Sequence, residues 1–316
     1  IQGSANTFTG SSVTVAGTTI GSTAYGVNLD GATLGGNGVL SVTGDSGMSA
    51  GVRLNSASLT RSTGNVTLNA PTGGTVVSAS SLQATAGTLS ISGTANSGHG
   101  VLLTNANSLN GTTVTVTGTT SSNFKDGVNV GEGTTNTLTG TGSLTITGTQ
   151  TGTAFHGVMI NQASINRSDT ISITGTASTS SDPGVSVSGG STVASGTTAL
   201  NITGNSGSGA GVKIVTASPA PASSVSGGNV TIHGISNSGT AAVSLQRGQV
   251  TGSGTVLIDA STGKAIEIDA NSSVLKNFDG DLSLVADQLT LDGTALATAT
   301  SGRVILRTLT TNRPIN

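Results

Sequence analysis

A four-residue motif of the form Gly-Val-x-Leu recurs along most of the chain, and no other feature constrains the fold as strongly. Its copies are GVNL at 26, GVRL at 51, GVLL at 100, GVNV at 127, GVMI at 157, GVSV at 184 and GVKI at 211. Self-similarity at a period of roughly 20 to 50 residues is the signature of repeat architectures. The chain is therefore expected to be a stack of similar units.

Each unit carries three groups of aliphatic residues, separated by glycines and polar residues. The first group is the aliphatic pair of the motif, as in Val27/Leu29, with a weaker copy near Val77/Ala79. A single aliphatic follows about five residues later, usually with a small residue such as Ala32 two positions before it. The third group is again an alternating pair, commonly followed by a glycine.

The second and third groups recur throughout the chain. The single aliphatics are Leu34, Leu59, Leu82, Leu109, Leu138, Ile165, Val193, Val225, Val250 and Val274. The third-group pairs are Leu40/Val42, Val66/Leu68, Leu89/Ile91, Val114/Val116, Leu144/Ile146, Ile171/Ile173, Leu200/Ile202, Val230/Ile232, Val256/Ile258 and Leu282/Leu284.

These groups predict an all-β fold. An apolar residue at every second position is typical of a strand with one face inward. Three short strands per unit of roughly 23 to 31 residues, without amphipathic helices, describe the coil of a single-stranded parallel β-helix. About ten or more coils are expected, and a right-handed path is the default for parallel strand crossovers.

The pattern changes near residue 255. Residues 1–255 are expected to form regular coils, and residues 256–316 terminal coils of the same solenoid with an altered pattern. Twelve of the 24 charged residues lie beyond residue 255, and the Gly-Val-x-Leu group disappears there.

Composition decides between a packed solenoid and a disordered chain. The 49 glycines and the 8% of charged residues differ from an ordinary globular domain and would suit disorder. The periodic aliphatics and the net charge of only −2 favour folding instead. Without cysteine no disulfide framework exists, and no apolar run approaches the 18 or so residues of a membrane span. The first ten residues lack the features of a signal peptide, so we expect a mature segment of a longer, secreted protein.

Two polar arrays are candidate binding sites. The residue before Gly-Val is His99, Asp126 or His156 in three successive units, so these side chains are predicted to share one corner and to bind a divalent metal. The alternative is a row of solvated turn residues. Outward positions of the third group, Thr115, Thr117, Thr145, Thr147, Ser172 and Thr174, are predicted to bind a glycan or to order water. Small hydroxyl-bearing residues also simply suit an exposed strand face.

Two further features bear on function. Glu267 and Asp269 flank Ile268 and should both point outward, as acid and base carboxylates would in a carbohydrate-active β-helical enzyme. Lys264 lies close by, so an exposed charge network is the favoured interpretation and no enzyme is expected. Phe124 and Phe155 lie in long turns of neighbouring units, where they form a sugar-stacking surface or cover the corner of the rod. The 11 basic residues are scattered, so no nucleic-acid partner is expected, and no cofactor motif is present.

Segments such as GVLL, TVTVTGTT, SLTITGTQ and GDLSLVADQLTLDG resemble the filament region of bacterial exoproteins of the filamentous haemagglutinin type, which two-partner secretion exports. The resemblance implies a β-helical adhesin on the cell surface or released from it, serving adhesion, aggregation or biofilm cohesion. Its partners would be a polysaccharide or a surface receptor, an outer-membrane transporter during secretion, and other copies of itself. The family's amino-terminal secretion signature is not found, so we expect an internal or carboxy-proximal segment. An ice-binding protein, suggested by the threonine-rich face, and a purely structural stalk are the remaining alternatives.

Overall fold

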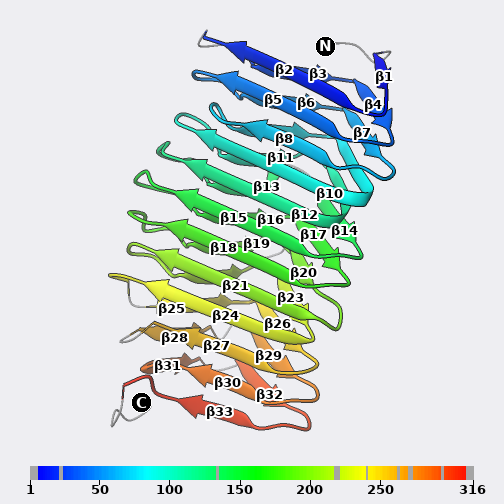
Figure 1. Ribbon diagram of the computed structural model, residues 1–316. Helices are drawn as coiled ribbons and strands as arrows, with labels where there is room; N and C mark the ends of the chain where they lie inside the picture. Colours follow the sequence, from blue (N-terminus) through cyan, green and yellow to red (C-terminus); the bar gives the residue numbers. More distant parts are fainter. Residues whose placement is uncertain are drawn as a thin grey trace.

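A computed structural model describes residues 6–20, 24–132, 135–216, 221–239, 241–261, 264–269, 273–292 and 295–310. Its 33 described strands form a right-handed parallel β-helix of about 11 turns with three strands per coil, as the sequence predicted. Strands β1 and β2 lie at one end of the rod and β33 at the other (Figure 1). The part of the chain that the structure describes holds no helix that would span a bilayer.

The first strand of every coil belongs to sheet A, in which each strand pairs in parallel with those of the neighbouring coils. Its members are β3 (Val27–Asp30), β6 (Val52–Asn55), β9 (Thr75–Ser78), β11 (Val101–Thr104), β13 (Val128–Glu132), β16 (Val158–Asn161), β19 (Val185–Ser188), β22 (Val212–Val215), β25 (Ala241–Gln246), β28 (Ala265–Ile268) and β31 (Gln288–Leu291).

The second and third strands of each coil together form sheet B. The second strands are β1 (Thr7–Thr9), β4 (Thr33–Gly36), β7 (Ser58–Arg61), β14 (Asn136–Gly140), β17 (Ala163–Arg167), β20 (Thr192–Ala194), β23 (Ser224–Gly227), β26 (Gln249–Gly252), β29 (Val274–Asn277) and β32 (Leu296–Ala299). The third strands are β2 (Val13–Thr19), β5 (Leu40–Ser46), β8 (Val66–Ala70), β15 (Leu144–Gln150), β18 (Ile171–Ala177), β21 (Ala199–Ser206), β24 (Asn229–Ser236), β27 (Val256–Ala260), β30 (Leu282–Val285) and β33 (Val304–Arg307). Strands β10 (Ser81–Ala95) and β12 (Ser108–Thr120) each run through both positions.

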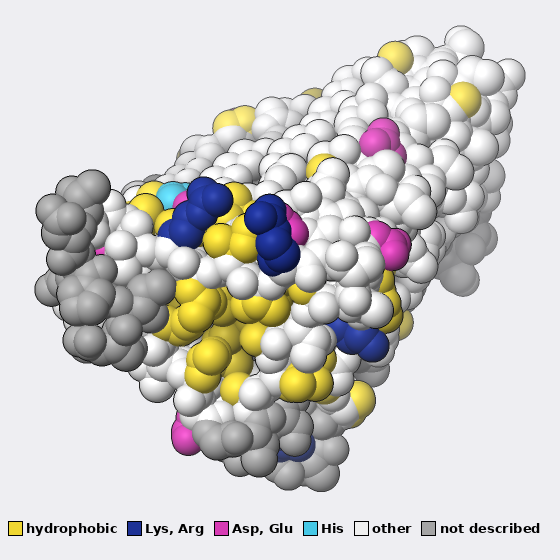
Figure 2. Space-filling model, turned by 90° about the horizontal axis from the view of Figure 1, so that it is seen from below, with side chains coloured by type: hydrophobic (Ala, Val, Ile, Leu, Met, Phe, Trp, Pro, Cys, Tyr) yellow, Lys and Arg dark blue, Asp and Glu magenta, His cyan; other side chains and the backbone are white. Residues whose placement is uncertain are grey.

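The core consists of columns of like side chains running along the rod. In sheet A, Val158 is in register with Val128 in one neighbouring coil and Val185 in the other, and all three are fully buried. A single coil has no such neighbours, so only stacking removes its aliphatic residues from water. Strands β28 to β33 continue both sheets beyond residue 255, and hydrophobic side chains gather on the end of the rod that they form (Figure 2). Residues 262–263, 270–272, 293–294 and 311–316 of the expected terminal coils lie outside the described residues.

Two apolar positions differ from the sequence prediction. Near residue 77 the inward pair is Thr75 and Val77, because Thr75 is in register with Val52 and Val101, whereas Ala79 occupies a turn at φ 49°. The buried threonine remains satisfied because its hydroxyl donates to the Ser92 carbonyl at 2.7 Å.

In β29 the inward aliphatic is Leu275, which is fully buried, and not Val274. Leu275 is the register partner of Val250, whereas Val274 pairs with the polar residue Gln249. The sequence offers two adjacent aliphatics, and only the pairing with the preceding coil determines which one faces inward.

In most coils, two glycines allow the third strand to lie close to the first strand of the next coil. Gly148 follows the apolar pair of β15, and Gly157 precedes that of β16. A methyl group on Gly148 would lie 2.0 Å from the carbonyl oxygen of Gly157, and one on Gly157 would lie 2.2 Å from the Thr176 nitrogen. The neighbours are backbone atoms, so no side chain can move aside. This contact explains why glycine recurs in both places.

The corner between the first and second strands contains a short polar ladder inside the rod. Asn107 and Asn136 are buried register neighbours, and the side-chain oxygen of Asn136 accepts from both the backbone and the side-chain N–H groups of Asn107. Asn107 in turn accepts from the Ser80 N–H at 2.9 Å and donates to the Val77 carbonyl. These side chains satisfy backbone groups that the turn leaves unpaired.

Two arginines are buried at the corner between the second and third strands. The Arg167 guanidinium donates to the carbonyl groups of Gly142 at 2.9 Å, Gly111 at 2.6 Å, Ser143 at 3.3 Å and Thr139. Arg167 lies in β17, which pairs with β14, and β14 pairs in turn with β12, the strand of Gly111. One side chain therefore joins three coils. Burial lowers the pKa of Arg167.

Arg61 occupies the corresponding corner nearer the β1 end of the rod, where its Nη1 donates to the carbonyls of Gly10 and Gly35. Its Nε and Nη2 are buried without a partner among the described residues. Each arginine is in register with a glycine of the preceding coil: Arg61 with Gly36, and Arg167 with Gly140. A side chain on either glycine would clash with the guanidinium group.

Candidate functional site

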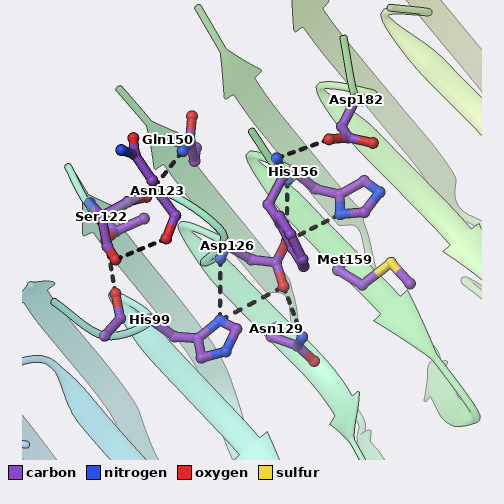
Figure 3. A network of polar contacts seen from close by, with 12 residues as sticks. His99, Ser122, Asn123, Asp126, Asn129, Gln150, His156, Met159 and Asp182 are labelled. Carbon is purple, nitrogen blue, oxygen red and sulfur yellow. Dashed lines mark hydrogen bonds and ion pairs between the residues drawn. The ribbon is translucent and has the colours of Figure 1, made fainter. Parts of the chain in front are cut away.

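The long turns that lead into β13 and β16 gather polar and aromatic side chains at one corner of the rod. His99, Asp126 and His156 precede the Gly-Val pairs of β11, β13 and β16, and the stacking of these strands places the three side chains side by side (Figure 3). The sequence prediction of their proximity is correct.

Asp126 is the centre of this cluster, with only 1% of its surface exposed. Its Oδ1 accepts from the His156 backbone N–H at 3.0 Å and lies 2.9 Å from His156 Nδ1. Its Oδ2 accepts from Asn129 Nδ2 at 2.7 Å and lies 3.5 Å from His99 Nδ1. The backbone N–H of Asp126 donates to His99 Nδ1, so that nitrogen carries no proton.

The surroundings shift two of the ionisation equilibria. Burial lowers the pKa of His99, and this effect outweighs the opposing influence of the Asp126 carboxylate. Burial alone would raise the pKa of Asp126, but the hydrogen bonds and charge of His156, with a contribution from His99, lower it below its usual value. Asp126 is therefore a carboxylate at neutral pH. It lies between the neutral imidazole of His99 and the imidazole of His156, to which it is hydrogen-bonded.

The metal-binding role that the sequence suggested for His99, Asp126 and His156 stays a prediction. The facing atoms are already joined to one another by hydrogen bonds, including a backbone N–H on His99. Among the described residues no group of three or more His, Cys, Asp or Glu side chains is placed to hold a metal ion. The hydrogen bonds of the cluster join the turns that carry it.

Phe124 and Phe155 form an exposed aromatic pair on the turns beside this cluster, which we call the aromatic shelf. Phe124 is 64% and Phe155 36% exposed, and their rings meet edge to face at 6.2 Å. The Phe155 ring meets His156 in the same manner. Both phenylalanines have positive φ angles, 67° and 79°, which bulky residues adopt only when their surroundings enforce it.

The backbone around the shelf is held by side chains of neighbouring coils. The Phe155 N–H donates to Asp182 Oδ2 at 2.8 Å, and the next N–H, that of His156, donates to Asp126. Gln150 Nε2 donates to the Ser122 carbonyl in the turn before Phe124. The backbone that carries the two exposed rings is thus held by hydrogen bonds to neighbouring coils.

No protein-family model, curated protein or solved structure matches this chain.

The predicted threonine face lies on the outer side of the third strands, away from sheet A. Its register partners are Thr115, Thr145 and Ser172 in one column and Thr117, Thr147 and Thr174 in the next. A third column, Thr119, Thr149 and Thr176, extends the array. Whether this face binds a glycan or orders water stays a prediction.

The remaining predicted residues lie further along sheet A. Glu267 and Asp269 both line a groove on its outer face, at and just after the end of β28. The aromatic shelf was predicted as a pair of turn aromatics, whereas Asp182 and Asn129 were missed. Asp182 precedes the Pro183-Gly184 step, and only the fold shows that its carboxylate reaches the turn of the preceding coil.

Acidification is expected to weaken folding through His99. Because the pKa of His99 is lowered from 6.5 in the folded protein, the unfolded chain binds more protons once the pH falls below about 6.5. The contribution of neutral His99 to the free energy of unfolding is therefore fully present above that pH. It is lost as the pH falls from 6.5 through the lower pKa that His99 has in the folded protein. Protonation also removes the acceptor of the Asp126 N–H. Urea unfolding between pH 8 and pH 5 measures the effect.

The variant His99→Gln keeps an acceptor for that N–H but cannot titrate, so its stability should depend less on pH over this range. His233→Gln is the matched control, because His233 pairs with Asp259 on the opposite sheet. Equal pH dependence in the wild type and His99→Gln would contradict the prediction.

Proposed function

We propose that this chain is a rigid segment of a secreted or cell-surface bacterial adhesin, serving adhesion, aggregation or cohesion of a biofilm matrix. The resemblance of its repeats to filamentous haemagglutinin-type exoproteins supports this proposal. The same resemblance suggests export through an outer-membrane transporter partner. Stacked aliphatic columns supply the rod, and the outer surface supplies the contacts.

The observation that carries the proposal is the aromatic shelf of Phe124 and Phe155. Aromatic rings offer a large contact area at a small cost in side-chain entropy, and the apolar faces of sugar rings suit such a surface. The partly exposed His156 imidazole and the Asp182 carboxylate beside the shelf offer hydrogen bonds to hydroxyl groups. We therefore propose a polysaccharide as the ligand, bound without catalysis. Contacts repeated along many rods would strengthen such binding by multivalency.

The test is binding of the purified chain to immobilised polysaccharides of neutral, anionic and amine-bearing types. The double variant Phe124→Ala/Phe155→Ala should weaken binding of at least one type by about tenfold or more, as expected for exposed aromatic anchors. Alanine keeps the constraint on φ that phenylalanine has, so the turn is not freed as it would be by glycine. Circular dichroism checks that the fold is intact.

The control is Thr145→Ala/Thr147→Ala on the threonine face. Loss of binding in the threonine variant alone would move the glycan site to that face, and binding of no polysaccharide would contradict the proposed function. The in-register threonine columns also favour ice binding as a second candidate. Thermal hysteresis in the wild type that Thr145→Ala/Thr147→Ala abolishes would support that candidate.

A further inference from the structure

A polar groove follows the outer face of sheet A beyond the aromatic shelf. One section, of about 290 Å³, lies between the turn at Asp182 and Glu267, and a second, of about 220 Å³, continues to Asp292. The two sections share Ser244, Gln246 and Glu267, so they form one groove along the rod. Asp182 also binds the Phe155 N–H, and the groove therefore begins where the shelf ends.

The floor of the groove is one outward column of sheet A. Lys213, Ser244, Glu267 and Thr290 are successive register partners in β22, β25, β28 and β31. Neighbouring strands lie about 4.8 Å apart, so this column spans roughly 14 Å parallel to the rod axis. A groove of this direction suits an extended chain lying across several coils.

Several polar side chains that line the groove make no hydrogen bond to the described residues. Ser244 is only 5% exposed, yet its hydroxyl makes no hydrogen bond to any described residue. The same holds for the side chains of Lys213, Gln246 and Glu267 within the described part of the chain. A buried polar group without a partner is unfavourable, whereas donors and acceptors left open in a groove are what a polar ligand requires.

The charges of the groove favour a cationic ligand. Four carboxylates line it, those of Asp182, Glu267, Asp269 and Asp292, against the single ammonium of Lys213. Three of the four lie in the section toward β31, which contains no basic side chain among its described lining residues. Anionic polymers would be repelled there, whereas ammonium groups would gain charge-assisted hydrogen bonds.

We infer that this groove binds an amino-sugar polysaccharide with free amino groups, whose ammonium groups lie near Glu267 and Asp292. Hydroxyl groups of the same chain would meet Ser244, Gln246 and Lys213. The inference rests on the proposed function, since it names the class of polysaccharide that the surface beginning at the aromatic shelf would bind. It also gives Glu267 and Asp269 a binding role in place of the acid and base roles considered from the sequence.

The test compares a glucosamine hexamer with its fully N-acetylated counterpart, by calorimetry at pH 6 and low salt. The glucosamine hexamer is expected to bind about tenfold more tightly, because charge-assisted contacts are lost on acetylation. Glu267→Gln should weaken its binding by about tenfold and reduce the preference, while Ser244→Ala should weaken both hexamers. Asp169→Asn, which removes the same charge at a turn of sheet B, should change nothing.

Equal affinity for the two hexamers, or unchanged binding by Glu267→Gln, would overturn the inference. If neither hexamer binds but a polysaccharide still binds through Phe124 and Phe155, the groove inference fails and the proposed function stands. If no saccharide of any type binds, both fail.

Discussion

Replacing Arg167 with methionine is expected to lower the free energy of unfolding by about 3 kcal/mol, since each buried acceptor left unpaired costs about 1 to 3 kcal/mol. Methionine keeps the aliphatic stem and removes the guanidinium, which leaves the carbonyl groups of Gly111, Thr139, Gly142 and Ser143 without this donor. Relief from burying a charge offsets part of the loss. Urea unfolding gives the total, and hydrogen exchange should show the greatest weakening in β12, β14 and β17.

Arg61→Met is the matched control. Arg61 is equally buried, but it donates to two carbonyl groups and leaves Nε and Nη2 unpaired. Removing it should therefore cost less than removing Arg167, about 1 kcal/mol or less once the relief of burying the charge is included. An equal or larger loss in Arg61→Met would show that the number of carbonyl partners does not determine the stabilisation.

Gly157→Ala is expected to destabilise the rod by at least about 3 kcal/mol, the upper range for overpacking a rigid site. The added methyl group would lie 2.2 Å from the Thr176 nitrogen, and the backbone at this corner belongs to two paired sheets. The coil must shift as a unit to accommodate it. Thermal unfolding followed by circular dichroism measures the loss.

Gly35→Ala separates this steric effect from the general effect of removing a glycine. A methyl group on Gly35 would meet only Thr9 Cγ2, at 3.7 Å, and its φ is not in the left-handed region. Lower backbone entropy of the unfolded chain should make this variant neutral or more stable by about 0.5 kcal/mol. Similar losses in Gly35→Ala and Gly157→Ala would refute the steric explanation.

The regular columns could be predicted from the sequence because each apolar position repeats. Val158 has the same role as Val128 and Val185, and the glycines around each pair recur for one steric reason. The misassigned positions lie where the sequence offers two candidates. Val274 and Leu275 are adjacent aliphatics, and Thr75 is a polar residue in an apolar column, so pairing with the neighbouring coil is needed to decide.

Hydrogen bonds made by residues that occur in only one or two coils could not be predicted from the sequence. Arg167 looks like any exposed arginine in the sequence, because its partners are backbone carbonyls that become available only when three coils are stacked. Asn107 and Asn136 occupy the position where the repeat shows small residues such as Ala57, and nothing local marks them as a ladder.

The candidate site was partly predictable for the same reason. His99, Asp126 and His156 share a repeat position, so their proximity follows from the period alone, whereas the hydrogen bonds that join them depend on turn geometry. The groove was missed except for Glu267 and Asp269. Lys213 and Ser244 differ in type, and only the alignment of β22 with β25 brings them into one column.

The parallel stacking of coils also determines how the rod carries mechanical load. The hydrogen bonds between neighbouring coils run parallel to the rod axis. Tension applied at the two ends therefore breaks the bonds of one terminal coil after another, instead of shearing the bonds of many coils at once. Each coil, such as the 27 residues from Val101 to its register partner Val128, would release up to about 90 Å of extended chain. Coils without a buried arginine should detach first, and the span joined by Arg167 should resist longest. A rod of this kind would lengthen in small steps under tension and so limit the force transmitted between its two ends.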